Sequence, residues 1–170
     1  MIKNKKLGEM KMFNKVLSEN REENYKMMLG AITDLLESEK DGLVILSVLP
    51  SFINSFMDDI NWVGFYKLRD DELSVGPFQG EPPCLRIKLG KGVCGAAAEQ
   101  EKIIVVENVH DFPGHIACDS KTNSEIVLPI MSHDEVWGVL DIDSPSLARF
   151  GELEKKYLQL IVEKLEVYLN

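Results

Sequence analysis

Apolar positions recur with a helical period near both ends of the chain. From about Phe13 to Ser38, and again from about Leu147 to Leu169, apolar residues return every three or four positions, with acids and lysines between them. That spacing predicts amphipathic helices. Asp41 is a typical cap residue and predicts a further helix over Gly42–Phe56, in which Pro50 should cause a kink or a restart.

The middle of the chain changes to short stretches rich in aromatic and β-branched residues, which are typical of strands. Two pairs of these stretches are each joined by a short polar turn, and they predict hairpins. The predicted hairpins are Asn61–Arg69 with Glu72–Phe78 and Ser124–Met131 with Glu135–Ile142; the other elements are the strands Leu85–Leu89 and Ile103–Val106, the helix Gly92–Gln100 and the polar loop His110–Thr122.

The order of these elements defines the expected fold class. Hairpins predominate, so the sheet should be mainly antiparallel, and the helices from the two ends of the chain can pack together on one of its faces. We therefore predict an α+β fold, or mixed α/β sandwich. The length favours a single domain spanning 1–170, in which residues 1–12 form a frayed N-terminal lead-in.

The charge balance narrows the choice of partners. With 19 basic and 28 acidic residues, the chain has a net charge of −9. Nucleic acids and anionic membranes are bound through basic surfaces, so neither is an expected partner. No apolar run approaches the roughly 18–20 residues of a membrane span. No apolar segment follows the basic N-terminus as a secretion signal would require, so we expect a cytoplasmic protein.

Three cysteines are the first candidates for chemistry, and they are too few and too odd in number for a disulfide framework. Cys84 follows two prolines, Cys94 stands beside a glycine, and Cys118 precedes an aspartate, so none lies in a clean apolar stretch. Each is a buried small side chain, a metal ligand or a reactive thiol. A zinc site with His110 and His115 is disfavoured, because no two cysteines have the close spacing of zinc ligands.

The segment Gly90–Gly95 fits the glycine pattern of a dinucleotide-binding loop. The predicted helix after it is too short for the usual crossover, and the strands before it are joined by hairpins. We therefore interpret the segment as a tight turn that leads into a short helix. Cys94 lies in the first turn of that helix, where backbone N–H groups would favour a thiolate.

Glu125, Asp141 and Asp143 lie in or beside two apolar strands. The two aspartates are two positions apart, so both project from the same face of one strand. Acids among core residues are costly unless they bind a cation, accept hydrogen bonds or keep a proton. Such a cluster can donate a proton, and it suits an ammonium ligand. The alternative is a strand end at which both aspartates reach water or cap turns before Ser144 and Pro145.

Aromatic residues mark the first predicted strand. Trp62, Gly64 and Tyr66 share one face, which predicts an aromatic wall with a gap at the glycine, while Val63 and Phe65 should face the core. The alternative is a second packed face under a helix.

Six motifs occur in order along the chain: Asn61–Tyr66, Gly76–Gly80, Gly90–Gly95, Phe112–Ser120, Asn123–Val127 and Gly138–Ser144. Together they resemble the motifs of the free methionine-(R)-sulfoxide reductases, which are small GAF-domain enzymes. The resemblance is dense over about residues 60–148 and extends thinly into both end helices. It implies a GAF-like fold with a mainly antiparallel sheet of about six strands, and a homodimer that forms through the end helices.

The resemblance also implies roles for individual residues. Cys118 matches the nucleophilic cysteine, Cys84 the resolving cysteine, and Cys94 a third cysteine with an auxiliary or recycling role. The acidic residues Glu125, Asp141 and Asp143 match the acids that line the substrate pocket, donate the proton and make polar contacts with the substrate; Trp62 and Tyr66 match its aromatic wall.

The implied activity is the thiol-dependent reduction of free L-methionine (R)-sulfoxide to methionine, a repair reaction in oxidative stress. It proceeds through a cysteine sulfenic acid and an intramolecular disulfide. Thioredoxin, which NADPH reduces through thioredoxin reductase, would reset the disulfide, and no bound cofactor or metal is expected. One alternative is a non-enzymatic, ligand-sensing GAF module that binds a small molecule, and another is a structural zinc protein.

Overall fold

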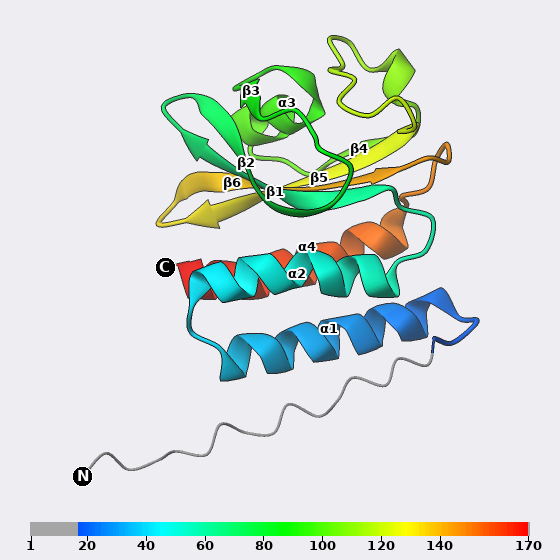
Figure 1. The fold of residues 1–170 in the computed structure, drawn as a ribbon, viewed down its shortest axis with the longest axis vertical. Coiled ribbons are helices and arrows are strands. Elements are labelled where there is room, and N and C mark those ends of the chain that lie inside the picture. Colours follow the sequence, from blue (N-terminus) through cyan, green and yellow to red (C-terminus); the bar gives the residue numbers. More distant parts are fainter. Residues whose placement is uncertain (1–16, 170) are drawn as a thin grey trace.

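A six-stranded antiparallel sheet separates two layers of the molecule (Figure 1). The computed structural model describes residues 17–169. The helices are α1 (Arg21–Ser38), α2 (Gly42–Phe56), α3 (Gly92–Gln100), the short 3₁₀ helix η1 (Val109–Asp111) and α4 (Glu152–Leu169); the strands are β1 (Trp62–Arg69), β2 (Glu72–Gly80), β3 (Arg86–Lys88), β4 (Ile104–Val106), β5 (Ser124–Ser132) and β6 (Glu135–Ser144). The predicted α+β class is confirmed.

The strand order β3-β2-β1-β6-β5-β4 places the two long hairpins side by side, because β1 of the first pairs with β6 of the second. Both hairpins turn through two residues with positive φ, Asp70 and Asp71 in one and His133 and Asp134 in the other. Two successive left-handed residues match the twist of the flanking strands, and aspartate tolerates that conformation better than most side chains. The turns therefore favour the pairing within each hairpin, of β1 with β2 and of β5 with β6.

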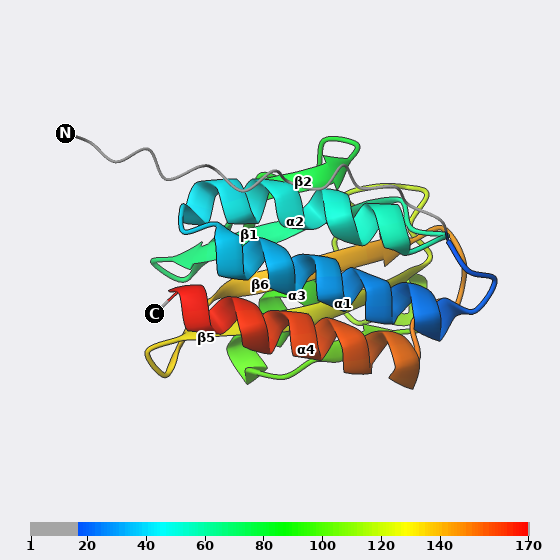
Figure 2. The ribbon, with the colours of Figure 1, turned by 90° about the horizontal axis from the view of Figure 1, so that it is seen from below.

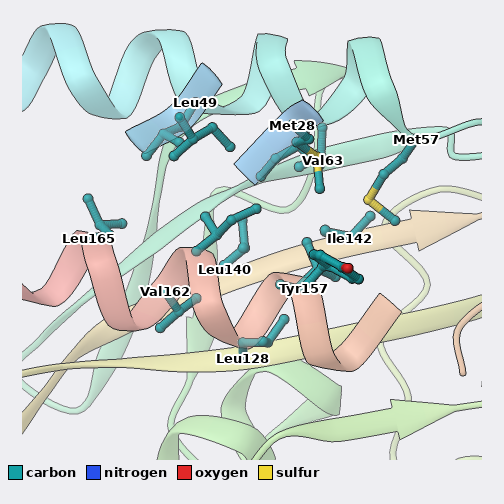
Figure 3. Packing of buried hydrophobic residues seen from close by; sticks show 14 of the residues in the cluster. Met28, Leu49, Met57, Val63, Leu128, Leu140, Ile142, Tyr157, Val162 and Leu165 are labelled. Atoms are coloured by element: carbon teal, nitrogen blue, oxygen red, sulfur yellow. The ribbon is translucent and has the colours of Figure 1, made fainter. Parts of the chain in front are cut away.

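Three helices cover one face of the sheet. α2 and α4 lie against the strands, and α1 lies between them on the side away from the sheet (Figures 1 and 2). The buried stripe of α1, which includes Tyr25, Met28, Ile32 and Leu36, has the predicted helical spacing. In Figure 3 this layer meets the sheet, where Met28 and Leu49 point toward the strand residues Val63, Leu140 and Ile142.

Alternation along β1 divides its side chains between two cores. Val63 and Phe65 pack into the helix layer, whereas Trp62 and Tyr66 pack into a second cluster on the opposite face with α3. The predicted division of this strand is confirmed. The second face carries the short helix, the short strands and the long loops, and it is where the candidate chemistry gathers.

Two predicted helix boundaries were wrong. The first helix begins at Arg21, because the Oδ1 atom of Asn20 accepts a hydrogen bond from the N–H of Glu22 at 2.9 Å and caps it. Residues 17–20 are not helical, and residues 1–16 lie outside the described part of the chain. The last helix begins at Glu152 rather than near Leu147, because the side chain of Arg149 is held by contacts to α1 and α4 and to the loop before β1.

The remaining differences are small. Pro50 lies inside α2 without dividing it, and the predicted polar loop begins with the last two residues of η1. The predicted strands agree with the observed ones to within two residues at each end. Across residues 17–169, none of the helices combines the length and apolar character needed to cross a bilayer.

Candidate active site

A partly open pocket lies on the face of the sheet opposite α1, α2 and α4. Its floor comes from β1, β5 and β6, one wall from the start of α3, and its cover from the loops at 81–83 and 115–122. Its cavity has a volume of about 40 Å³. One water molecule needs roughly 10–15 Å³ on this measure, so the space holds a few waters.

Cys84 and Cys118 form a disulfide that ties the two covering loops together. The residues are 34 positions apart, and their Cα atoms lie 5.3 Å from each other. The Tyr66 hydroxyl donates a hydrogen bond to the carbonyl oxygen of Cys84 at 3.0 Å and so fixes one side of the bridge to β1. The two sulfurs thus stand at the cover of the pocket.

Asn61 holds the other side of the cover, and sequence reasoning assigned it no role. Its amide Nδ2 donates to Asp119 Oδ2 at 2.9 Å and to Thr122 Oγ1 at 3.0 Å. The backbone N–H of Lys121 also donates to Asp119, and these donors hold the pKa of that carboxyl below its usual value. Its place at the start of the motif Asn61–Tyr66 was the one feature of the sequence that could have indicated a role for it. It anchors the loop that carries Cys118.

The three predicted acids meet on the pocket floor through strand register. Glu125 on β5 stands opposite Asp143 on β6, and Asp141 stands opposite Gly64 on β1. Glu125 and Asp141 are only 6% and 5% exposed. The alternative, in which both aspartates reach water at a strand end, is therefore wrong for Asp141, while Asp143 keeps partial exposure.

Burial changes the ionisation of this acidic cluster. Loss of hydration, followed by repulsion from neighbouring carboxylates, raises the pKa of Glu125 and of Asp143 well above the usual range. Burial also raises the pKa of Asp141, to about 6, and hydrogen bonds from Cys94 and Glu125 limit that rise. As the pH rises, Asp141 is therefore the first of the three acids to lose its proton. Glu125 keeps its proton and donates a hydrogen bond to the Asp141 carboxylate. The cluster holds both a proton donor and a negative charge.

Cys94 lies against the acids and not in a thiolate-forming environment. Its Sγ is 3.9 Å from Glu125 Oε1, and burial together with the charges of Asp141 and Glu125 raises the pKa of the thiol well above its usual value. The expectation that the start of the helix favours a thiolate was wrong, because desolvation and the nearby acids outweigh the helix N–H groups. At neutral pH this thiol is protonated.

The aromatic wall is present, but its gap is filled. The rings of Trp62 and Tyr66 lie 5.8 Å apart, and Trp62 stacks on Phe78 with a centroid distance of 5.5 Å. A Cβ atom on Gly64 would collide with the Trp62 ring and the Phe78 side chain, so the glycine admits the stacked pair rather than opening a space. Sequence reasoning did not include Phe78 in the aromatic wall, because its contact with Trp62 depends on the pairing of β1 with β2.

The segment Gly90–Gly95 and the two loop histidines lie close to the pocket or next to it in the chain, and their contacts are as follows: the glycine segment packs against β3, and the histidines lie in the covering loop and beside it. A Cβ on Gly95 would lie 2.5 Å from the carbonyl oxygen of Lys88, so this glycine lets α3 pack against the turn after β3. His115 lines the pocket, whereas His110 lies 3.0 Å from Asn123 Oδ1. With Cys84 and Cys118 joined, those two sulfurs are not zinc ligands in this form.

Replacing Asp141 with asparagine should flatten the dependence of stability on pH. Because the folded state raises the pKa of this acid from 3.8 to about 6, it binds the proton more tightly than the unfolded chain, and stability falls as pH rises through that interval. Between pH 4 and pH 7, wild type should lose on the order of 2 kcal/mol more than the Asp141→Asn variant. Urea unfolding at the two pH values measures this difference.

The matched control is Asp34→Asn, which changes an exposed carboxyl on α1 and should follow wild type. An equal fall in stability for Asp141→Asn and wild type would contradict the ionisation scheme.

Comparisons with known proteins agree over nearly the whole described chain. The family model for the GAF domain matches residues 27–169. The free methionine-R-sulfoxide reductase of Escherichia coli is 42% identical over 150 residues, which cover 88% of this chain and 91% of that protein. The structure of fRMsr of Staphylococcus aureus in its reduced form has a TM-score of 0.84 and 46% identity, covering 86% of this chain and 96% of that one. The structure of free methionine-R-sulfoxide reductase from Neisseria meningitidis in complex with its substrate has a TM-score of 0.87 and 36% identity, covering 91% and 93%.

Proposed function

Because the chain belongs to the free methionine-R-sulfoxide reductase family of GAF-domain proteins, we propose that it reduces free L-methionine (R)-sulfoxide to methionine. The GAF-like fold expected from the sequence is confirmed. The observation that carries the proposal is the Cys84–Cys118 disulfide above a pocket floored by buried, proton-holding carboxyls. Once the disulfide is reduced, its two thiols can supply two electrons and the carboxyls a proton at the same place.

The pocket lining supports recognition of a small amino acid. Trp62 and Tyr66 offer an apolar surface that suits the S-methyl end of the substrate. The ionised carboxylate of Asp141 suits the α-ammonium group, which a methionine sulfoxide inside a polypeptide lacks. We propose that Asp141 and Asp143 bind this group and that the proton comes from the acidic cluster.

The reduction begins at Cys118. Its sulfur attacks the sulfoxide sulfur while a protonated carboxyl of the cluster, for which we propose Glu125 because its pKa is raised, donates a proton to the sulfoxide oxygen. The oxygen passes to Cys118, which becomes a sulfenic acid, and methionine leaves. The substrate sulfur gains two electrons and Cys118 loses two. The thiol proton of Cys118 balances the proton that the carboxyl gave.

Cys84 then resolves the sulfenic acid. Its thiol forms the S–S bond with Cys118 and water leaves, which gives the disulfide present in this structure. An external dithiol, for which we propose thioredoxin supplied by NADPH and thioredoxin reductase, exchanges with that disulfide and is itself oxidised. Cys94 keeps its proton, so we propose an auxiliary or recycling role for it and not the first attack.

The oligomeric state and the cellular location follow from the family resemblance and the sequence. We propose a single domain that forms a homodimer through its end helices and acts in the cytoplasm.

The experiment is a coupled assay of NADPH consumption with thioredoxin and thioredoxin reductase. We expect turnover with free methionine (R)-sulfoxide, and none with the S epimer or with sulfoxide inside a peptide. Equal rates on free and peptide-bound sulfoxide would overturn the role given to the α-ammonium group. No turnover on any substrate, with binding of another small molecule, would favour the ligand-sensing module.

A further inference from the structure

Three potential metal ligands converge at the floor of the pocket. One ligand atom each from Cys94, Glu125 and Asp141 lies within 4.8 Å of the others, and all three residues are buried. The Cys94 Sγ to Glu125 Oε1 distance is 3.9 Å. Tetrahedral zinc, with Zn–S near 2.3 Å and Zn–O near 2.0 Å, separates a sulfur from an oxygen ligand by about 3.5 Å. A shift of a few tenths of an ångström would therefore close this pair around an ion.

A second observation points to a missing ligand at the same place. Asp141 Oδ1 is buried and accepts no hydrogen bond from the described residues, although the residue is only 5% exposed. An unsatisfied carboxylate oxygen at that depth is costly. Asp141 lines the cavity, so a rotation of its carboxyl would bring this oxygen to a cation or donor in the pocket.

We propose that Cys94, Glu125 and Asp141 form a zinc-binding site that inhibits the protein when it is occupied. A thiolate with two carboxylates is a ligand set that favours Zn²⁺ or Cd²⁺ over Mg²⁺ and Ca²⁺, because the hard cations select oxygen ligands alone. Three protein ligands leave the fourth tetrahedral position open toward the cavity. The ion would replace the protons of Cys94 and Glu125, and its two positive charges offset three closely spaced negative ligands.

Occupation would remove the groups that the proposed reaction uses. Glu125 would lose the proton it gives to the sulfoxide, and Asp141 would lose the charge that attracts the ammonium group. Inhibition therefore rests on the proposed function, whereas metal binding does not. Zinc and methionine sulfoxide should compete for the pocket.

The test uses the oxidised protein, since Cys84 and Cys118 are then joined and Cys94 is the one free thiol of the chain. Titration with Zn²⁺ should saturate at one ion per chain and release protons. Titration with Cd²⁺ should produce the ultraviolet charge-transfer band of a cadmium–thiolate bond. Inhibition of sulfoxide reduction by Zn²⁺ is measured separately and should be relieved by more substrate.

Two variants locate the site. Cys94→Ala should abolish the cadmium–thiolate band, and Asp141→Asn should weaken zinc binding at least about tenfold, as even outer-shell changes do at zinc sites. The control Glu107→Gln removes an exposed carboxyl and should bind as wild type does. If Cys94→Ala does not fold, the nearly isosteric Asp141→Asn still decides the matter.

Failure of binding and failure of the reductase proposal are distinguishable. Lack of saturable zinc binding by the folded, oxidised protein would overturn the metal site whatever the enzymatic activity. Zinc binding that is unchanged in both variants would overturn it as well. Stoichiometric binding without any sulfoxide turnover would leave the site in place and remove only its inhibitory role.

Discussion

Replacing Cys118 with serine abolishes sulfoxide reduction, whereas replacing Cys84 with serine leaves one rapid turnover; this is the result we expect. Loss of a covalent nucleophile should lower the rate by ~10³-fold or more, because Cys94, the other thiol that lines the pocket, keeps its proton. Without Cys84, Cys118 can still form the sulfenic acid once. Methionine release should then stop near one equivalent per chain.

Rapid quenching followed by amino-acid analysis, with no added reductant, measures the methionine released. Wild type should also release about one equivalent, and only wild type should continue when dithiol reductant is supplied through thioredoxin. Full activity of Cys118→Ser would refute the proposed nucleophile. Absence of the burst in a folded Cys84→Ser variant would show that Cys84 acts before methionine leaves.

Replacing Arg149 with methionine should destabilise the fold by up to about 3–5 kcal/mol, since the half-exposed Arg21, 3.6 Å away, is then the cation that remains beside the buried Glu154. The Arg149 side chain is 2% exposed and donates to Glu154 Oε1 at 3.0 Å, to the Tyr25 hydroxyl at 3.2 Å and to Asp58 Oδ1 at 2.9 Å. Burial alone would raise the pKa of Glu154, but the Gly151 N–H, Tyr25 and Arg149 hold it below its usual value. Free energies from urea unfolding measure the loss.

The matched control is Arg86→Met, because that side chain is 62% exposed and its nitrogen lies 3.7 Å from Glu72. An exposed pair of this kind contributes about 0–1 kcal/mol. The double variant Arg149→Met with Glu154→Gln should recover part of the lost stability, since it also removes the buried negative charge of Glu154. Equal effects of Arg149→Met and Arg86→Met would show that the buried network contributes no more than a surface contact.

The features that sequence reasoning predicted well depend on short-range pattern. The alternation of β1 assigned Trp62 and Tyr66 to one face and Val63 to the other, and register then placed Asp141 and Glu125 on the same face as the aromatic residues. Period and turn chemistry act over a few residues, so a single sequence contains them.

The features it missed depend on contacts between distant segments. The environment of Cys94 is created by β5 and β6, which no local pattern around the cysteine reveals. The start of α4 was misjudged because Arg149 is held by Tyr25, 124 positions earlier. The pairing of Cys84 with Cys118 had no basis in spacing, and the roles of both came only from the family resemblance.

The small cavity under the disulfide has a consequence for the order of events. With Cys84 and Cys118 joined, the pocket holds about 40 Å³, far less than an intact methionine sulfoxide molecule requires. In the proposed cycle the oxidised protein must therefore be emptied of product and reopened before the next substrate enters. Substrate and reductant therefore act on the protein alternately, the reductant on the oxidised form and the substrate on the reduced form.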